Sequence, residues 1–453
     1  MDFIELNSLF CGDSSTIKDA MKTIDRNGLS IALIVDDKKK FLGLVTDGDI
    51  RRALMSGKTL GTKIKEIMNR NVIIARDGEK LALPEKIRED MNRSGYSMKV
   101  PVLDKEGRIK DVLLISSEKK KSLLRSKVKP EYVKRVLVVG GAGYLGSLIV
   151  KKLLAKNYKV RVLDNLMYGD AGLKEFFGNK NFEFINGDMR DIKVLTSALK
   201  NMDAVIHLAG IVGDPACSFD PKETLETNLF ATKILAEMCK YYQINRFIFS
   251  STCSVYGESS GENYLDEDSE LNPVSLYAES KLMIERMLLE MAEGNFASTI
   301  FRMGTLYGAS PRMRFDLVIN LLTAKAIVDK EITVFGGQQW RPFIHVDDAA
   351  EFYIECIELP IDKVRGMVFN IGSEKQNYKI IEIARIINRK IRDAKLVITE
   401  KAGDRRNYKT SFNKAYSVFK FRPKKTVENA VEEIKNMPQT LHYRDEKYCN
   451  RER

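Results

Sequence analysis

Tyr277 and Lys281 are the side chains of this chain with the clearest capacity for acid–base chemistry. They lie four residues apart in a segment whose apolar spacing predicts a helix over about 275–293, so both would share one helix face. Thr252 ends RFIFSST, a predicted strand that precedes them. A phenol with a pKa of about 10 is a poor base at neutral pH, but a nearby ammonium group favours the phenolate. Tyr277 and Lys281 together predict acid–base chemistry; the alternative is a packed tyrosine beside a lysine with a buried stem.

A glycine-rich loop lies at the start of the same region. Residues 134–146 read KRVLVVGGAGYLG, with Gly140, Gly143 and Gly146 between a short β-branched strand and a predicted helix. Glycines allow a tight turn and a close approach of the backbone to a diphosphate, which the N–H groups of the helix would bind. Because the strand and the helix are both present, the loop predicts a dinucleotide site, which also contains Tyr144 and Leu145.

Three further predicted strands end in residues suited to a cofactor crevice. YKVRVLD ends at Asp164, 18 residues after Gly146, and Asn165 follows it. An acid at this position accepts bonds from the adenine-ribose hydroxyls and repels a 2′-phosphate, which favours NAD over NADP. The other two strand ends contribute Asp188, Met189, Leu208, Ala209 and Gly210. In a doubly wound parallel sheet, such strand ends line the ligand crevice.

The motifs from residue 134 to about 435 together resemble the extended short-chain dehydrogenase/reductase family, in its NDP-sugar epimerase and dehydratase branch. The resemblance rests on GGAGYLG, VLDNL, NGDMRD, AVIHLAG, SSTCSVYG, YAESK, RPFIHVDD and GDRRNY. It implies an α/β fold for residues 134–453, a Rossmann-type doubly wound parallel sheet with a smaller C-terminal substrate-binding α/β part. It also implies that Tyr277 is the acid/base at a sugar hydroxyl, that Thr252 bonds this hydroxyl, and that Lys281 bonds the nicotinamide ribose.

The residues after Thr252 narrow the reaction that the resemblance implies. Sugar dehydratases of the family carry Asp-Glu there and the decarboxylases carry a Glu, whereas this chain has Cys253 and Ser254. We therefore expect an NAD-dependent epimerase of a nucleotide-diphosphate sugar, acting in the simplest case at C4 through a transient keto sugar. The alternatives are an NAD(P)H-dependent reductase of a keto-sugar nucleotide, and a sensor that binds a dinucleotide and an adenylate without turnover.

The C-terminal segments of the family bind the sugar nucleotide. The resemblance implies that Arg341 binds the substrate diphosphate, that Arg405 and Arg406 lie in the loop that grips the nucleotide, and that Thr305 stands where the family has an Asn. An arginine fork suits phosphate oxygens, although a solvated surface charge is the alternative for each arginine. Cys253 is expected to line the substrate pocket or to pack beside it. The helices over 228–242 and 275–293 are expected either to pair across a homodimer, as in the family, or to belong to the core.

Residues 1–118 form a separate predicted unit with an internal repeat. Residues 16–55 and 79–118 each begin with a helix, a strand, a turn and a strand, which predicts two α+β half-domains that bury each other's sheet face. FLGLVTDGDIRRAL, residues 41–54, resembles a cystathionine-β-synthase (CBS) domain, and a tandem CBS pair would be a regulatory module for an adenine nucleotide effector. In this resemblance Thr46 and Asp49 hold the nucleotide; the alternative is that they cap a helix. The second half has no Thr-x-x-Asp.

Charge and composition set broader expectations. Residues 119–133 are expected to be a basic linker, since residues 116–135 hold eight Lys or Arg against two Glu. The net charge is +12, but the basic residues are spread along the chain, so we expect an anionic small-molecule substrate and no nucleic acid. The sequence has no apolar run that could cross a bilayer and no basic signal region, which predicts no membrane association. Six scattered cysteines and three histidines predict a cytoplasmic protein without a metal site or a disulfide framework.

Overall fold

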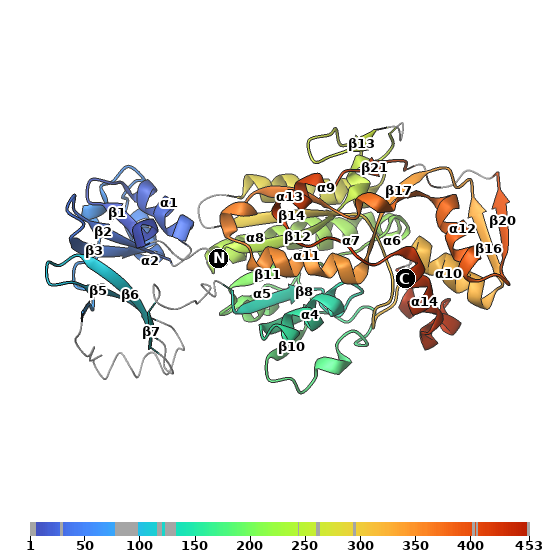
Figure 1. The fold of residues 1–453 in the computed structure, drawn as a ribbon, viewed down its shortest axis with the longest axis horizontal. Helices are drawn as coiled ribbons and strands as arrows, with labels where there is room; N and C mark the ends of the chain where they lie inside the picture. Colours follow the sequence, from blue (N-terminus) through green and yellow to red (C-terminus); the bar gives the residue numbers. More distant parts are fainter. Residues whose placement is uncertain are drawn as a thin grey trace. The chain divides into compact units, whose positions relative to one another are not determined.

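The structure, a computed structural model, describes residues 6–27, 30–77, 98–115, 120–122, 133–242, 244–259, 263–292, 296–400, 404 and 406–450. The chain divides into two compact units, Met1–Tyr132 and Val133–Arg453 (Figure 1). None of the described helices combines the length and the apolar character that a bilayer-crossing segment needs.

The first half of the N-terminal unit is a three-stranded sheet with two helices. The strands are β1 (Phe10–Gly12), β2 (Ile31–Val35) and β3 (Phe41–Thr46), with β1 parallel and β3 antiparallel to β2. The helices are α1 (Ile17–Asn27) and α2 (Asp47–Met55). One face of β2, at Ala32 and Ile34, packs against Ile17 of α1 and Ile50 of α2. The other face is free to meet the second half.

The second half repeats the strand plan of the first. Its strands are β4 (Ala75–Arg76), β5 (Met98–Leu103) and β6 (Ile109–Ile115), with β4 parallel and β6 antiparallel to β5. Both hairpins have a register irregularity near the end of the inner strand, at Ile34/Val35 and at Val102/Leu103. Both turns are also closed by an aspartate, since Asp36 Oδ1 and Asp104 Oδ1 each accept bonds from the N–H groups two and four residues later. The internal repeat is therefore present in the pairing and in the turns.

The two halves pack sheet face against sheet face. Ile31 and Leu33 of β2 share one apolar cluster with Leu103, Ile109 and Val112 of the second half. The halves differ after β6, where β7 (Lys120–Ser122) pairs antiparallel with β6 in place of a helix such as α2. Residues 120–122 fall within the segment expected to be a linker, so the paired structure extends further than expected. The helix expected near residues 79–95 lies outside the described residues.

The C-terminal unit is built around a seven-stranded sheet in which all neighbouring strands are parallel (Figure 1). The strands are β8 (Arg135–Val139), β9 (Lys159–Asp164), β10 (Phe182–Asn186), β11 (Ala204–His207), β12 (Arg246–Thr252), β14 (Ala297–Met303) and β18 (Met367–Ile371). Their order is β10-β9-β8-β11-β12-β14-β18. The order reverses between β8 and β11, and ligands of such sheets bind beyond the carboxyl ends of the strands at this point. The predicted Rossmann-type doubly wound parallel sheet is confirmed.

Helices cover both faces of this sheet. One face packs on α4 (Gly146–Ala155) and α11 (Val346–Glu358), the other on α5 (Ile192–Leu199), α8 (Ala231–Tyr241) and α9 (Leu276–Glu290). Successive strand residues point to opposite faces, since Val136 and Val138 join the first apolar cluster whereas Leu137 and Val139 join the second. Burial on both faces explains why the strands read as continuous apolar runs.

A smaller part is built mostly from segments that follow β14 in the chain, and β13 (Tyr264–Leu265) precedes β14. It holds a three-stranded sheet of β15 (Thr305–Tyr307), β17 (Trp340–His345) and β19 (Asn377–Lys379), a pair of β16 (Glu331–Phe335) and β20 (Lys395–Thr399), and a pair of β13 and β21 (Lys409–Thr410). Its helices are α10 (Val318–Val328), α12 (Ile380–Lys390), α13 (Asn413–Val418) and α14 (Val427–Lys435). Ile319, Ile383 and Val431 place α10, α12 and α14 around one apolar cluster.

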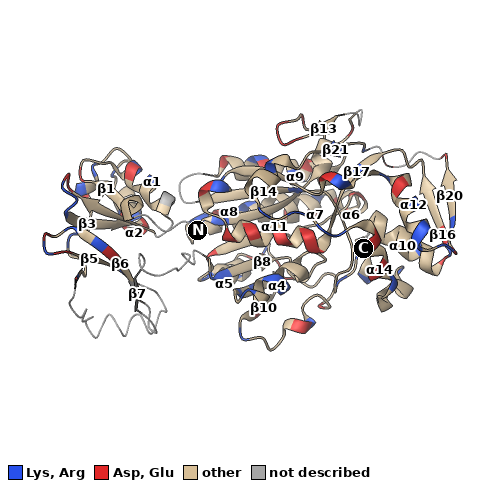
Figure 2. Ribbon diagram, viewed as in Figure 1, with Lys and Arg blue, Asp and Glu red and all other residues tan. Residues whose placement is uncertain are grey.

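Charged residues of both signs are interspersed along the ribbon of the C-terminal unit in Figure 2. Several of them join helices to each other. Lys152 of α4 lies 2.9 Å from Asp347 and 2.7 Å from Glu351 of α11, so these two helices are linked by charge as well as by apolar packing. Partly exposed pairs of this kind contribute little stability each.

Candidate active site

The glycine-rich loop between β8 and α4 forms a tight backbone cradle. Gly140 has a φ of +86°, and a Cβ atom there would lie 2.6 Å from the backbone nitrogen of Ala209. A Cβ atom on Gly146 would lie 2.3 Å from the carbonyl oxygen of Gly140. α4 begins at Gly146 with no capping side chain and no acidic residue in its first turn. Its first N–H groups are therefore not taken up by a side chain, and the cradle fits the diphosphate of a dinucleotide.

Asp164 ends β9 beside this cradle. Its Oδ2 accepts a bond of 3.0 Å from the Ala142 N–H, and its Oδ1 accepts a bond of 2.9 Å from the Leu166 N–H. Burial raises the pKa of Asp164, and the two backbone bonds oppose that rise. The side chain of Asn165 bonds Asp188, whose neighbour Met189 is buried. The strand ends predicted to border the adenosine half of a dinucleotide therefore lie close to the glycine loop.

The end of β11 is held by an asparagine that the sequence analysis did not single out. Leu208 and Ala209 both donate from their backbone nitrogens to Val139 O, at 2.9 and 3.0 Å, and Gly210 follows them. Asn228 lies in a π-helical turn, η4 (Glu226–Phe230), and its side chain accepts from Ile211 N at 2.7 Å and donates to Ile211 O at 2.9 Å. Asn228 thus fixes the loop that leaves β11 at the switch point.

Thr252, Tyr277 and Lys281 meet at the carboxyl end of β12. The side chain of Thr252, the last residue of β12, lies close enough to the Tyr277 hydroxyl to act on its proton affinity. Lys281 follows one turn later on α9; its Nζ donates to Ser250 O at 2.8 Å and lies 4.6 Å from the centre of the Phe249 ring. Lys281 is only 3% exposed, and burial lowers its pKa to about 8. The structure therefore brings the three predicted residues together.

The proton affinity of Tyr277 depends on charges from several segments. Burial raises its pKa, and the Arg314 guanidinium is the main opposing charge. Cys217 and Asp214 raise the pKa further. Without other charges the phenol keeps its proton at neutral pH, so a phenolate needs more positive charge nearby, such as that of an oxidised nicotinamide ring.

A buried ion pair lies beneath the three residues. Glu285, one turn after Lys281 on α9, accepts from Arg302 of β14, with Nη2 at 2.8 Å from Oε2 and Nε at 3.2 Å from Oε1. The side chains of Arg302 and Glu285 are 5% and 1% exposed. Ser251 of β12 donates from Oγ to Glu285 Oε1. Glu285 therefore fixes the position of α9 against β12 and β14.

Arg341 and Arg406 lie together on the substrate side, joined by Asp404. Arg341 Nη2 lies 3.0 Å from Asp404 Oδ2, and Arg406 pairs with the same carboxylate. Arg406 also lies 3.1 Å from Asp214 Oδ2 and donates to Ser254 Oγ at 3.3 Å. Burial would raise the pKa of Asp404, but the two arginines hold it at about 2. Arg341, predicted to bind the diphosphate, and Arg406, predicted to lie in the nucleotide loop, thus share one charge cluster; Arg405 lies outside the described residues.

A cavity of about 580 Å³ adjoins this cluster. It is lined by Asp214, Ser218, Glu258, Val274, Ser275, Leu276, Glu279, Asp404 and Arg406. Ser275 and Leu276 directly precede Tyr277, so the cavity opens beside the start of α9. Its position between Arg406 and the start of α9 suits the entry of a charged substrate.

Cys253 and Thr305 take different places. Cys253 is 1% exposed, packs with Val255, Tyr256 and Leu282, and donates from Sγ to Arg302 O at 3.2 Å. Burial raises the pKa of its thiol, so the thiol is neutral. Cys253 is not among the residues that line the cavity, and packing is the role that its contacts support. Thr305 begins β15, opposite Phe343 of β17, and is half-buried.

In the N-terminal unit, Thr46 and Asp49 form a capping box at the start of α2. Thr46 Oγ1 donates to Asp49 Oδ2 at 2.7 Å, and the Asp49 N–H donates to Thr46 Oγ1 at 3.2 Å. Arg52 pairs with the other carboxylate oxygen. Thr16 and Asp19 make the same two bonds at the start of α1. Helix capping accounts for both pairs, and nucleotide binding by Thr46 and Asp49 stays a prediction.

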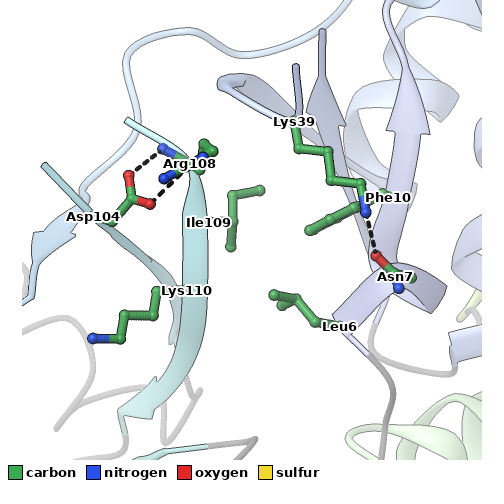
Figure 3. A pocket seen from close by; sticks show the side chains of 8 residues that line it. All are labelled: Leu6, Asn7, Phe10, Lys39, Asp104, Arg108, Ile109 and Lys110. Atoms are coloured by element: carbon green, nitrogen blue, oxygen red, sulfur yellow. Dashed lines mark hydrogen bonds and ion pairs between the residues drawn. The ribbon is translucent and has the colours of Figure 1, made fainter. Parts of the chain in front are cut away.

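A second cavity, of about 400 Å³, lies at the hairpin end of the N-terminal unit (Figure 3). It is lined by Leu6, Asn7, Phe10, Lys39, Asp104, Arg108, Ile109 and Lys110. Arg108 Nε lies 3.0 Å from Asp104 Oδ2, Lys39 Nζ donates to Asn7 at 3.3 Å, and Lys110 pairs with Asp77. Because each cation already has a partner, this cavity gives no indication of a ligand. Within the described ranges no group of His, Cys, Asp and Glu has an arrangement that could hold a metal ion.

Several functional residues were missed in the sequence. Glu285 could have been found, because it lies four residues after Lys281 on the same helix face. Arg302 could also have been found, because it is the one charged residue of the buried strand ASTIFRM. Arg314 lies in an irregular segment and Asp214 begins the short helix α6 (Asp214–Phe219), and only the folded chain brings them near Tyr277.

Comparisons with known proteins agree with this arrangement. Residues 136–372 match the NAD dependent epimerase/dehydratase family. Residues 4–56, the first half of the N-terminal unit, match the CBS domain. The match covers one CBS domain, and the tandem pair stays a prediction.

Individual relatives fall in the same family. The UDP-glucose 4-epimerase of Bacillus subtilis (strain 168) is 31% identical over 274 residues, which cover 55% of this chain and 80% of that protein. UDP-glucuronic acid decarboxylase 1 of Xenopus tropicalis is 26% identical over 319 residues, which cover 68% of this chain and 72% of that protein. Among solved structures, UDP-glucuronic acid 4-epimerase from Bacillus cereus in complex with UDP-glucuronic acid and NAD is 27% identical with a TM-score of 0.60, covering 67% of this chain and 98% of that one.

Proposed function

The chain belongs to the NAD dependent epimerase/dehydratase family, and from that premise we propose that it inverts one carbon of the sugar in a nucleotide-diphosphate sugar, with C4 as the simplest case. The observation that carries the proposal is the placement of Tyr277 beside Thr252 and the buried Lys281, at the carboxyl end of β12. A protein that only binds its ligands has no need of this arrangement, which is suited to moving one proton.

The residues that follow Thr252 support epimerisation over elimination of water or loss of carbon dioxide. An elimination needs a further acid and base at the sugar, and Cys253 and Ser254 stand where the dehydratases have them. Cys253 is buried and neutral, and Ser254 Oγ accepts from Arg406. Neither side chain is placed to act as a second acid.

The roles of the residues follow from their contacts. NAD held at the glycine cradle and Asp164 would supply hydride transfer to and from the sugar carbon. Tyr277 takes the proton of the sugar hydroxyl as that carbon is oxidised and gives it back on reduction. Lys281 favours the phenolate with its charge, and Thr252 orients the Tyr277 oxygen. Arg341 and Arg406 bind the substrate diphosphate, and Asp404 keeps their guanidinium groups together.

The fit of NAD to this chain rests on the glycine cradle, on Asp164 and on the strand ends beside them. A Cβ on Gly140 or Gly146 would collide with the backbone, which is consistent with a site built for close approach of a diphosphate. The Asp164 carboxylate lies at the cradle, where it can accept the ribose hydroxyls.

Two further assignments belong to this proposal. The homodimer is proposed to form through α8 and α9, because Tyr241 is 78% and Met283 48% exposed on these helices, and Phe230 just before α8 is 55% exposed. The N-terminal unit is proposed to bind an adenine nucleotide that regulates the enzyme, with Thr46 and Asp49 at the site.

The test is a substrate screen with the full-length protein. UDP-, GDP-, CDP- and dTDP-sugars are incubated with it, and the product stereochemistry is read by NMR. Interconversion of two epimers without consumption of NAD supports the proposal, whereas stoichiometric loss of NAD(P)H indicates a reductase. Tyr277→Phe is expected to lower turnover by about 100- to 10,000-fold, and Tyr264→Phe, at an exposed tyrosine outside the site, is the control. Unchanged turnover in Tyr277→Phe would refute the assigned mechanism.

A further inference from the structure

The segment 308–316, between β15 and α10, lies directly against the glycine-rich loop. The Tyr144 hydroxyl donates to Gly308 O at 2.6 Å and accepts from Asn320 Nδ2 at 3.1 Å. Ser310 Oγ donates to Tyr144 O at 2.7 Å. These bonds join residues more than 160 positions apart in the chain, so the segment 308–316 forms a second wall beside the cofactor cradle.

Arg312 is a buried cation with an unsatisfied donor in this segment. It is 3% exposed, and its Nε has no hydrogen-bond partner. Its guanidinium lies 4.1 Å from the centre of the Tyr168 ring. Arg312 also acts electrostatically on Asp164, the carboxylate assigned to the adenine ribose. Burial lowers the pKa of Arg312 to about 10.

Arg314 occupies the other end of the same segment. Its side chain is 12% exposed and pairs with Asp316. Its charge acts on Tyr277 and on Tyr144. Arg312 and Arg314 therefore line segment 308–316 with two buried cations, from the Asp164 end of the site to the Tyr277 end, and Arg312 keeps one N–H donor without a partner. A buried donor without a partner is costly, and an anionic ligand would satisfy it.

We propose that Arg312 and Arg314 bind the diphosphate of NAD from the side of segment 308–316 and so retain the cofactor between turnovers. This proposal rests on the proposed function, because an epimerase regenerates its NAD in every cycle and gains from keeping it. The diphosphate of the substrate is a poorer fit to Arg312 and Arg314, because a separate arginine pair is present for it. Arg341 and Arg406 both pair with Asp404, beside the cavity of about 580 Å³.

The C-terminal residues fix the position of this segment. Arg312 Nη2 donates to Asn450 Oδ1 at 2.7 Å, and the Phe315 N–H donates to Tyr448 O at 2.8 Å. The Phe315 ring meets the Tyr448 ring edge-on, with 6.0 Å between centres. Retention of NAD is therefore expected to depend on Asn450 as well as on the arginines.

The test measures NAD itself. Full-length protein is purified, its NAD content is determined after denaturation, and the rate of NAD release is followed after rapid gel filtration. Arg312→Met, Arg314→Met and Asn450→Ala are compared with Arg422→Met, an arginine outside this segment that also stacks on a tyrosine. The first two variants are expected to release NAD about 10- to 100-fold faster, Asn450→Ala by a smaller factor, and Arg422→Met at the wild-type rate.

The outcomes separate this proposal from the proposed function. If the arginine variants release NAD at the wild-type rate but bind the nucleotide sugar more weakly, the retention proposal is wrong and the arginines belong to the substrate site. Unchanged release and an unchanged Kd for the nucleotide sugar would overturn the proposal as well. Faster release in a protein that converts no nucleotide sugar would support retention while the proposed function fails. If Arg314→Met leaves Asp316 unpaired and does not fold, the double variant Arg314→Met/Asp316→Leu provides the same measurement.

Discussion

Replacing Glu285 with Gln is expected to shift the pH dependence of turnover, because Glu285 raises the pKa of Lys281. Burial is the larger influence and lowers the pKa of Lys281 to about 8; Cys217 on α6 (Asp214–Phe219) raises it together with Glu285. The other titratable groups that face Lys281 are Tyr277 and His207, and burial holds the pKa of His207 at about 3, so this imidazole is neutral. Lys281 is charged below its pKa, so activity that needs the ammonium is lost as the pH rises through that value.

The size of the shift follows from the helix geometry. Residues four apart on a helix have Cβ atoms about 5–6 Å apart. At an effective dielectric of about 20, two unit charges about 6 Å apart interact by about 3 kcal/mol, or about two pKa units. Arg302 lies 2.8 Å from the Glu285 carboxylate and offsets part of this, so we expect the pKa of Lys281 to fall by about one unit. At pH 7.5 the charged fraction then falls about threefold, and at pH 6 it changes by only about a tenth.

The assay is kcat against pH with saturating nucleotide sugar. Glu285→Gln is expected to lose activity on the alkaline side about one pH unit earlier than the wild type. Ser251→Ala is the matched control, since it removes a hydrogen bond to Glu285 but keeps the charge, and its alkaline pKa should not move. A uniform fall in kcat for Glu285→Gln with the same alkaline pKa would refute the electrostatic reasoning. If Glu285→Gln does not fold, Glu285→Leu with Arg302→Met removes the same carboxylate together with its partner.

Three further outcomes are expected. Cys253→Ala should destabilise the fold by about 1–2 kcal/mol in urea unfolding without changing the shape of the pH profile, and a changed profile would contradict the packing role of the buried thiol. Met283→Glu should convert a dimer to a monomer in light scattering, and a monomeric wild-type chain would contradict the proposed α8–α9 interface. Asp19→Asn and Asp49→Asn should each lower the melting temperature slightly by weakening a capping box. Only Asp49→Asn should also abolish a rise in the melting temperature with AMP, ADP or ATP, and equal responses in the two variants would exclude Asp49 from the site.

The residues that could be predicted are those whose neighbours are set by local periodicity. Tyr277 and Lys281 share a helix face because they are four residues apart, and Asp164 ends a strand whose place in the sheet follows from the parallel pattern. Arg312 and Arg314 could not be placed in this way. Their segment has no repeat, and its position depends on the bond between Tyr144 and Gly308, which are 164 residues apart.

The Thr-x-x-Asp pattern shows a different limit of sequence reasoning. Thr46 and Asp49 stand in a segment that matches the CBS domain, yet Thr16 and Asp19 form the same capping box thirty residues earlier. The Thr-x-x-Asp pattern therefore caps two helices of this unit, α1 and α2. The motif by itself cannot separate capping from nucleotide binding, because both uses need a hydroxyl and a carboxylate at the start of a helix.

The length of β12 has a consequence for engineering this chain. Ser251 of β12 donates to Glu285, and Thr252 at the carboxyl end of the strand lies beside Tyr277, so α9 contacts β12 at both residues. β12 pairs with β14 residue by residue, from Arg246–Ala297 to Thr252–Met303. Inserting or deleting one residue within β12 would exchange the two hydroxyls between the faces of the sheet. A change in the length of the strand would therefore displace both hydroxyls, so an inserted label or tag belongs in a connecting loop.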